Sequence, residues 1–202
     1  MHRTRNRVVL AMLMPVVLFL AACGVNSIPT AEENAKAKWA DVQASFQRRA
    51  NLIPNLVETV RASARSEQGI LTGVTEARSN ATRITVSPEQ LSDPAAMARF
   101  SEAQSRLSAA ILPLRQLQEA YPTLQSQENF QTLMSQLEGT ENRINIAIRD
   151  YNEAVRGYNT EIRTFPSVIG ARVIYGSQPM VPYQAVTPGA EVAPTVSFGN
   201  GQ

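Results

Sequence analysis

The chain has 202 residues, 44% of them hydrophobic and 18% charged, with 19 Lys and Arg against 17 Asp and Glu. Beyond residue 22 its basic side chains are interleaved with acidic ones, which excludes the clustered basic surface by which proteins bind nucleic acids. Cys23 is the only cysteine and His2 the only histidine. A disulfide within one copy and a catalytic or metal site built on histidines are therefore also excluded.

Residues 1–22 have the pattern of a secretory signal peptide. Arg3, Arg5 and Arg7 precede an apolar run over residues 8–22, and this run is shorter than the roughly 20 residues that a membrane-spanning helix needs. Cleavage removes three bases and no acid, so the mature chain keeps 16 bases against 17 acids and a net charge of −1.

The signal ends in Leu20-Ala21-Ala22-Cys23, which resembles the lipobox of bacterial lipoproteins. We therefore expect Cys23 to carry lipid and to anchor the mature chain to a membrane outside the cytoplasm. By the same resemblance, Gly24 in place of aspartate directs the protein to the periplasmic face of the outer membrane in a cell with two membranes. The alternatives are cleavage that leaves Cys23 free and an uncleaved N-terminal anchor.

Residues 30–165 predict an all-α domain. Apolar residues recur at steps of three and four in four runs, about 30–64, 66–82, 94–121 and 126–164, which places them on one face of each helix. The main members are Trp39, Val42, Phe46, Ala50, Ile53, Val57, Val60 and Ala64, then Leu71, Val74, Ala77 and Ala81, then Met97, Phe100, Gln104, Leu107, Ile111 and Leu114, then Phe130, Leu133, Leu137, Glu141, Ile144, Ile148, Tyr151, Val155, Tyr158, Ile162 and Phe165. A long helix with a narrow seam is typical of an elongated antiparallel helical bundle, here of four or so helices.

Capping residues mark the predicted helix starts. Thr30 with Glu33 indicates a capping box, and Ser87-Pro88 and Asp93-Pro94 each place an N-cap residue before a proline suited to the first helical position. The first of these two dipeptides is expected to start only a turn or two.

The composition changes after residue 165. Residues 166–202 contain five of the 12 prolines and five of the ten glycines, so we expect an extended or disordered tail whose apolar residues 168–169 and 173–175 can dock on the bundle. The tail is either a ligand for another protein or a terminus without a function. The expected organisation is thus a signal at 1–22, a lipidated linker at 23–29, a bundle at 30–165 and this tail.

The mature sequence contains no glycine-rich phosphate loop, no Gly-x-Ser-x-Gly string and no acidic metal-binding loop. We assign no catalytic residue, cofactor or metal. One enzymatic alternative, a cell-wall or lipid hydrolase, would use carboxylates alone, such as Glu138, Glu141 and Glu153.

Several strings along the chain identify a family. The longest include Phe46–Val60 (FQRRANLIPNLVETV) and Leu137–Ile144 (LEGTENRI), the latter continued by Arg149–Val155 (RDYNEAV), with Val74–Arg78 (VTEAR) between them. These strings closely resemble the LemA family of bacterial envelope proteins, over about residues 30–196. The resemblance implies a helical fold and carries over no biochemical activity. Many LemA-like proteins have an uncleaved N-terminal membrane helix, which a lipid anchor replaces in this chain.

Charged residues of these strings are the candidate site. Arg49 and Glu141 lie near the apolar seams, where a charge is costly unless paired. We hypothesise that Arg49 or Arg48 pairs with Glu141 or Glu138 and fixes the register of the first and last helices. The alternative is that polar motif residues line a groove for a partner, namely Glu76, Arg78, Asn142, Arg143 and Asp150.

The leading functional hypothesis is a membrane-anchored envelope scaffold or adaptor without catalysis, whose partner is another envelope protein. An accessory subunit of an envelope proteolysis or quality-control complex is the second hypothesis, and the carboxylate enzyme is the third. The long apolar seam also permits a homo-oligomer.

Overall fold

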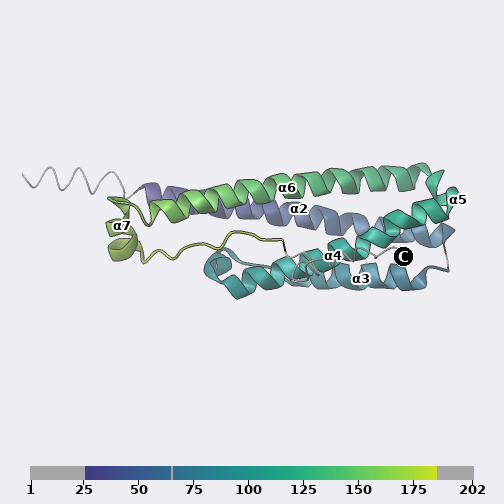
Figure 1. Ribbon diagram of the computed structural model, residues 1–202, viewed down its shortest axis with the longest axis horizontal. Helices are drawn as coiled ribbons and strands as arrows, with labels where there is room; N and C mark the ends of the chain where they lie inside the picture. Colours follow the sequence, from purple (N-terminus) through teal and green to yellow (C-terminus); the bar gives the residue numbers. More distant parts are fainter. Residues whose placement is uncertain (1–25, 65, 186–202) are drawn as a thin grey trace, which may run out of the picture. The chain divides into compact units, whose positions relative to one another are not determined.

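A computed structural model describes residues 26–64 and 66–185 of the chain (Figure 1). The expected signal peptide, Cys23 and the tail beyond residue 185 lie outside the described residues. These contain helices and no strand, which confirms the all-α fold. The long helices are α2 (Ser27–Ser63), α3 (Gln68–Arg83), α4 (Pro94–Ala120) and α6 (Glu128–Glu161), and the short ones are η1 (Pro88–Ser92), α5 (Pro122–Gln125), α7 (Ser167–Gly170) and the π-helical turn η2 (Ala171–Tyr175).

The predicted helix starts are confirmed at two places and wrong at one. Ser87 and Gln90 form a capping box at the start of the single-turn η1, and Asp93 accepts a hydrogen bond from the Ala95 amide before α4. The expected capping box at Thr30 is not the start of α2, because the helix already begins at Ser27 and the Thr30 hydroxyl donates to the Asn26 carbonyl. Pro29 permits this earlier start, since first-turn amides have no intrahelical partner.

The described residues form two compact units, which are treated separately. The first contains residues 26–49, 86–97 and 136–183, and the second contains residues 50–85, 98–135 and 184–185.

In the first unit, α2 and α6 lie side by side and antiparallel (Figure 1). Ser27 bonds to Glu161, the Trp39 ring lies 5.0 Å from the Tyr151 ring, and Arg49 bonds to Glu141. The contacts move forward along α2 as they move backward along α6, which is the order that antiparallel helices give. The predicted seams provide the buried core of this unit, which includes Trp39, Val42, Phe46, Leu137, Ile144, Tyr151, Val155 and Tyr158.

In the second unit, α3 pairs antiparallel with the end of α2 and with α4. Arg78 of α3 donates to the Ala50 carbonyl of α2, and Gln104 of α4 donates to the Ala81 carbonyl of α3. The buried side chains again follow the predicted stripes and include Ile53, Val57, Val60, Leu71, Val74, Phe100, Leu107, Ile111, Leu114 and Phe130.

The end of the last stripe differs from the expectation. Helix α6 ends at Glu161, so Phe165 does not continue its buried face and is 71% exposed. The chain then forms α7 and η2 over residues 167–175 instead of the extended chain expected from residue 166. Only from Gly176, whose φ of 58° suits glycine, to residue 185 is it without regular structure. None of the helices in the described ranges combines the length and hydrophobicity needed to cross a membrane.

Candidate functional site

Two asparagines of α6 hold an extended segment of the same chain. The Asn159 side chain donates to the Met180 carbonyl at 2.8 Å and accepts from the Met180 amide at 2.9 Å. Asn152 does the same for Tyr183, at 3.0 and 2.8 Å. Each side-chain amide thus satisfies both backbone groups of one residue, as a neighbouring β-strand would. We call Asn152 and Asn159 the asparagine clamp, and residues 178–183 the strap.

Two further contacts hold the middle of the strap. The Tyr151 hydroxyl donates to the Val181 carbonyl at 2.9 Å, and the Val181 amide donates to the Leu91 carbonyl at 2.8 Å. Burial raises the pKa of the Tyr151 hydroxyl far above its ordinary value of 10.0, so the phenol remains a proton donor throughout the physiological pH range.

The strap buries two of its side chains, at positions three residues apart. Met180 and Tyr183 are buried, and the Tyr183 ring lies 5.9 Å from the Phe46 ring of α2. Pro179 and Pro182 are exposed. The site therefore holds an extended backbone segment of the same chain through six hydrogen bonds and buries two of its side chains.

Helix α2 holds a second stretch of irregular chain in the same unit. The Trp39 indole and the Gln43 amide both donate to the Val86 carbonyl, at 2.9 and 3.0 Å. The two donors are one helical turn apart, so a single face of α2 fixes the segment that precedes η1.

Arg78 has a structural task in the second unit. Its Nε donates to the Ala50 carbonyl at 2.7 Å. Pro54 lies four residues later inside α2, and a proline has no amide hydrogen to give to that carbonyl. The guanidinium therefore takes the place of the hydrogen bond that Pro54 removes.

The pairing expected between Arg49 and Glu141 is present in the first unit. Arg49 is only 1% exposed, and its Nη1 lies 3.1 Å from Glu141 Oε1. The guanidinium also lies 5.0 Å from the centre of the Phe46 ring, a cation–π distance. The role of this pair in fixing helix register stays a prediction.

We expect Glu141→Gln to lower the free energy of unfolding by about 1–2 kcal/mol, because the buried Arg49 then loses an anionic partner. The value stays small because Glu141 is partly exposed to water. Urea unfolding followed by circular dichroism measures it. Glu138→Gln, an exposed neighbour on α6, is the matched control, and equal unfolding curves for the two variants would contradict the prediction.

The other sequence candidates differ in their surroundings. Arg48, Glu138, Asn142 and Arg143 are exposed. The Asp150 carboxylate forms two long ion pairs, Oδ2 lying 4.0 Å from Lys38 Nζ and Oδ1 lying 3.9 Å from Arg149 Nε. Glu76 lines a hollow between α3 and α4 with Arg83, Arg99 and Arg106, whereas Arg78 bonds to Ala50. Among the described residues, no group of three His, Cys, Asp or Glu side chains is placed to hold a metal ion.

Glu161 ties the start of α2 to α7. Its Oε1 accepts hydrogen bonds from Ser167 at 2.6 Å and Ser27 at 2.5 Å. These bonds hold the pKa of the Glu161 carboxyl below its usual value of 4.5. Figure 1 shows α7 beside the first turns of α2.

The Glu161 contacts predict acid sensitivity at this end of the first unit. A lowered folded-state pKa contributes stability above the unfolded-state pKa, and this stability is lost as the pH falls through the folded-state value. After correction for the intrinsic pH dependence of amide exchange, the protection of residues 27, 28, 30, 31 and 167–171 is therefore expected to decrease when the pH drops below about 4.5. Glu161→Gln should remove most of this pH dependence, and Glu153→Gln, on an exposed face of α6, should retain it. An unchanged pH profile in Glu161→Gln would contradict the assignment.

Sequence reasoning missed the asparagine clamp. Asn152 belongs to a string used for the family resemblance, and Asn159 follows seven residues later, which is two turns along the same helix face. That spacing of two amides beside an apolar seam is the one signal that the sequence offers.

Comparison with known proteins gives one family and two curated relatives. A family model described as the LemA family matches residues 38–198. Two curated relatives are magnetosome protein MamQ 1 and magnetosome protein MamQ 2 of Paramagnetospirillum magneticum. Each is 27% identical over 179 residues, covering 76% of this chain and 63% of the relative. The chain therefore spans less than two thirds of the length of these relatives.

Proposed function

Since this chain belongs to the LemA family, we propose that it is a membrane-anchored, non-catalytic scaffold or adaptor of the bacterial envelope. One observation carries the proposal. The polar side chains of its family-like strings hold the chain itself in place, Asn152 by clamping the strap, Arg78 by replacing a lost backbone bond and Arg49 by pairing with Glu141. Polar side chains that bond to the chain itself make its surface rigid. A rigid surface of this kind suits the binding of another protein, which is the function of a scaffold or adaptor.

The anchoring part of the proposal rests on the sequence. Cys23 carries lipid and holds the start of α2 near the membrane. The curated relatives are named as magnetosome proteins, and we take this as support for a role in organising an envelope or organelle membrane.

The adaptor part rests on the strap. The clamp fixes the chain up to Tyr183 on α6, and residues 186–202 follow this segment in the sequence. A partner can bind this terminal stretch, the rigid helical surface or both.

Affinity purification from native membranes after crosslinking tests the proposal. We would compare the full chain, a chain that ends at Ala185 and the Cys23→Ser variant. Ending at Ala185 keeps the strap and its buried Met180 and Tyr183, so a loss of binding reports on residues 186–202 and not on a disturbed core.

The outcomes separate the parts of the proposal. A partner that is lost from the shortened chain supports an adaptor acting through its terminus, and one that is retained places binding on the helical surface. A membrane protease as partner would favour the quality-control hypothesis. If no specific protein is recovered with any variant, the adaptor proposal fails. If Cys23→Ser stays in the membrane like the wild type, lipid anchoring fails.

A further inference from the structure

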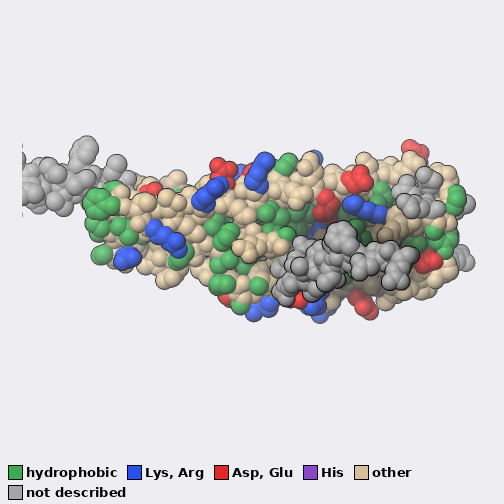
Figure 2. Space-filling view, in the orientation of Figure 1, with side chains coloured by type: hydrophobic (Ala, Val, Ile, Leu, Met, Phe, Trp, Pro, Cys, Tyr) green, Lys and Arg blue, Asp and Glu red, His purple; other side chains and the backbone are tan. Residues whose placement is uncertain are grey.

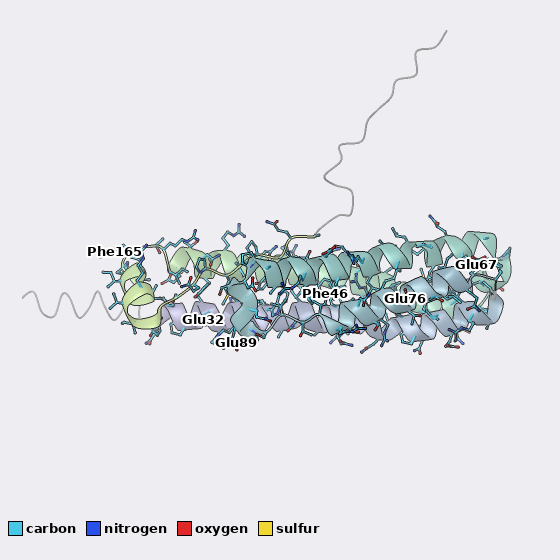
Figure 3. The ribbon with its side chains drawn as sticks, turned by 90° about the horizontal axis from the view of Figure 1, so that it is seen from below. Glu32, Phe46, Glu67, Glu76, Glu89 and Phe165 are labelled. Atoms are coloured by element: carbon cyan, nitrogen blue, oxygen red, sulfur yellow. The ribbon has the colours of Figure 1, made fainter. Side chains whose placement is uncertain are left out.

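The end of the first unit around α7 carries an unusual group of exposed apolar side chains, which we call the apolar cap. Figure 2 shows hydrophobic side chains gathered over this end, and Figure 3 labels Phe165 beside α7. The members and their exposed fractions are Phe165 (71%), Ile169 (56%), Val173 (79%) and Ile174 (61%). Four large apolar residues exposed within ten positions form a patch of the kind that marks a binding surface.

The charged side chains within the segment that carries the apolar cap have one sign. Arg163 and Arg172 are exposed, and the sequence from Ile162 to Gln178 contains no acid. The nearest acid before this stretch, Glu161, is engaged by Ser27 and Ser167. Glu32 and Glu89 line a hollow with Tyr175 at the end of this segment, whereas Arg163 and Arg172 flank the exposed apolar residues in the sequence. Exposed apolar side chains with flanking cations complement the surface of a bilayer that contains anionic lipids.

The apolar cap lies beside the start of α2. Gly170 lies beside Ile28, since a Cβ at position 170 would lie in ordinary van der Waals contact with Ile28 Cδ1, at 3.6 Å. The Ser27–Glu161–Ser167 hydrogen bonds join the same two segments. The described chain therefore begins, at Asn26, next to this cap, and Cys23 is three residues earlier in the sequence.

We infer that the apolar cap rests on the membrane surface and sets the orientation of the first unit on the bilayer. The inference rests on the proposed anchoring and extends it. Three residues span at most about 11 Å, so lipid on Cys23 brings the cap to the depth of the headgroups. Interfacial side chains enter a bilayer by about 5–10 Å. We choose a bilayer as the binding partner of the apolar cap because the lipid anchor holds the neighbouring start of the chain at the membrane.

Site-directed labelling of the full chain in membranes tests this. Cys23 is the only cysteine and has no free thiol once acylated, so a fluorophore on Val173→Cys is specific. The protein is purified from membranes and reconstituted into vesicles of phosphatidylethanolamine and phosphatidylglycerol with a phosphatidylcholine that carries a quencher near the top of its acyl chain. Leu112→Cys and Ile146→Cys are matched controls, since both residues are exposed apolar residues of helices, at 56% and 43%.

We expect several-fold stronger quenching at position 173 than at positions 112 and 146, and weaker quenching at 173 when Arg172→Glu is added. Equal quenching at all three positions in membrane-bound protein would overturn the cap as a membrane contact and leave the anchoring intact. Recovery of the chain outside the membrane fraction would overturn the anchoring, and the inference with it.

Discussion

Replacing both Asn152 and Asn159 with alanine is expected to release the strap from α6 while the helices stay folded. The double substitution removes four hydrogen bonds, each worth about 1 kcal/mol net, so the strap loses about 4 kcal/mol of attachment. The buried Met180 and Tyr183 retain hydrophobic contact, but their backbone groups then lack partners. The strap should therefore open locally, and the free energy of this local opening should be far smaller than the free energy of global unfolding.

Amide hydrogen exchange measures this release directly. Protection of the Met180, Val181 and Tyr183 amides should fall by about a thousand-fold, which is the equivalent of about 4 kcal/mol, while the amides of α6 keep theirs. Asn145→Ala, an exposed asparagine of α6, is the matched control. Unchanged protection of the strap in the double variant would show that the clamp contributes nothing to holding it.

Asn159→Asp separates the contributions of the two hydrogen bonds that Asn159 makes to Met180. An ionised aspartate still accepts from the Met180 amide but no longer donates to the Met180 carbonyl, which it repels. The carboxyl pKa is therefore raised in the folded state, and its contribution is present at low pH and lost as the pH rises through that value. Strap protection should recover on acidification in Asn159→Asp and should stay low in Asn159→Ala.

The helices of this fold could be predicted from sequence because their buried faces repeat. Trp39, Val42 and Phe46 follow one face of α2, and Tyr151 and Val155 one face of α6, and all five are buried. Periodicity does not mark where a helix ends, however. Phe165 continues the spacing of the α6 stripe, but the helix ends at Glu161. The end is organised by the hydrogen bond from Ser27 to Glu161, which joins residues distant in sequence and leaves no local signal.

The candidate site could be predicted only where charge conflicts with burial. Arg49 required a partner because it lies in an apolar seam, and Glu141 meets it. The asparagine clamp involves no such conflict, since an amide is neutral and common on helix surfaces. Its partners, Met180 and Tyr183, lie in a segment whose prolines indicate extended chain but not where that chain lies.

Arg78 and Pro54 are a third case. The sequence shows that a backbone hydrogen bond is missing at Pro54, and only the structure shows which group replaces it. A proline inside a helix leaves the carbonyl four residues earlier without its amide donor, which in α2 is the Ala50 carbonyl. The hydrogen bond from Arg78 Nε is charge-assisted and stronger than the one removed. Both residues belong to strings that resemble the family, and the contact gives a reason for their joint occurrence.

A double-mutant cycle tests this explanation. Arg78→Ala is expected to lower the free energy of unfolding by about 2–3 kcal/mol, because the Ala50 carbonyl then loses a charged donor. In a Pro54→Ala background the amide of residue 54 again donates to that carbonyl, so Arg78→Ala should cost at least about 1 kcal/mol less. Urea unfolding of the four proteins gives the coupling energy.

Arg83→Ala provides the matched control for the cycle, since Arg83 is an exposed arginine of the same helix and bonds to Ser79. Its cost should be small and equal in both backgrounds. A coupling near zero between positions 54 and 78 would mean that Arg78 stabilises α3 by another route. A large coupling would show that a helix-interior proline is tolerated in α2 because an arginine of the neighbouring helix completes the backbone hydrogen bonding there.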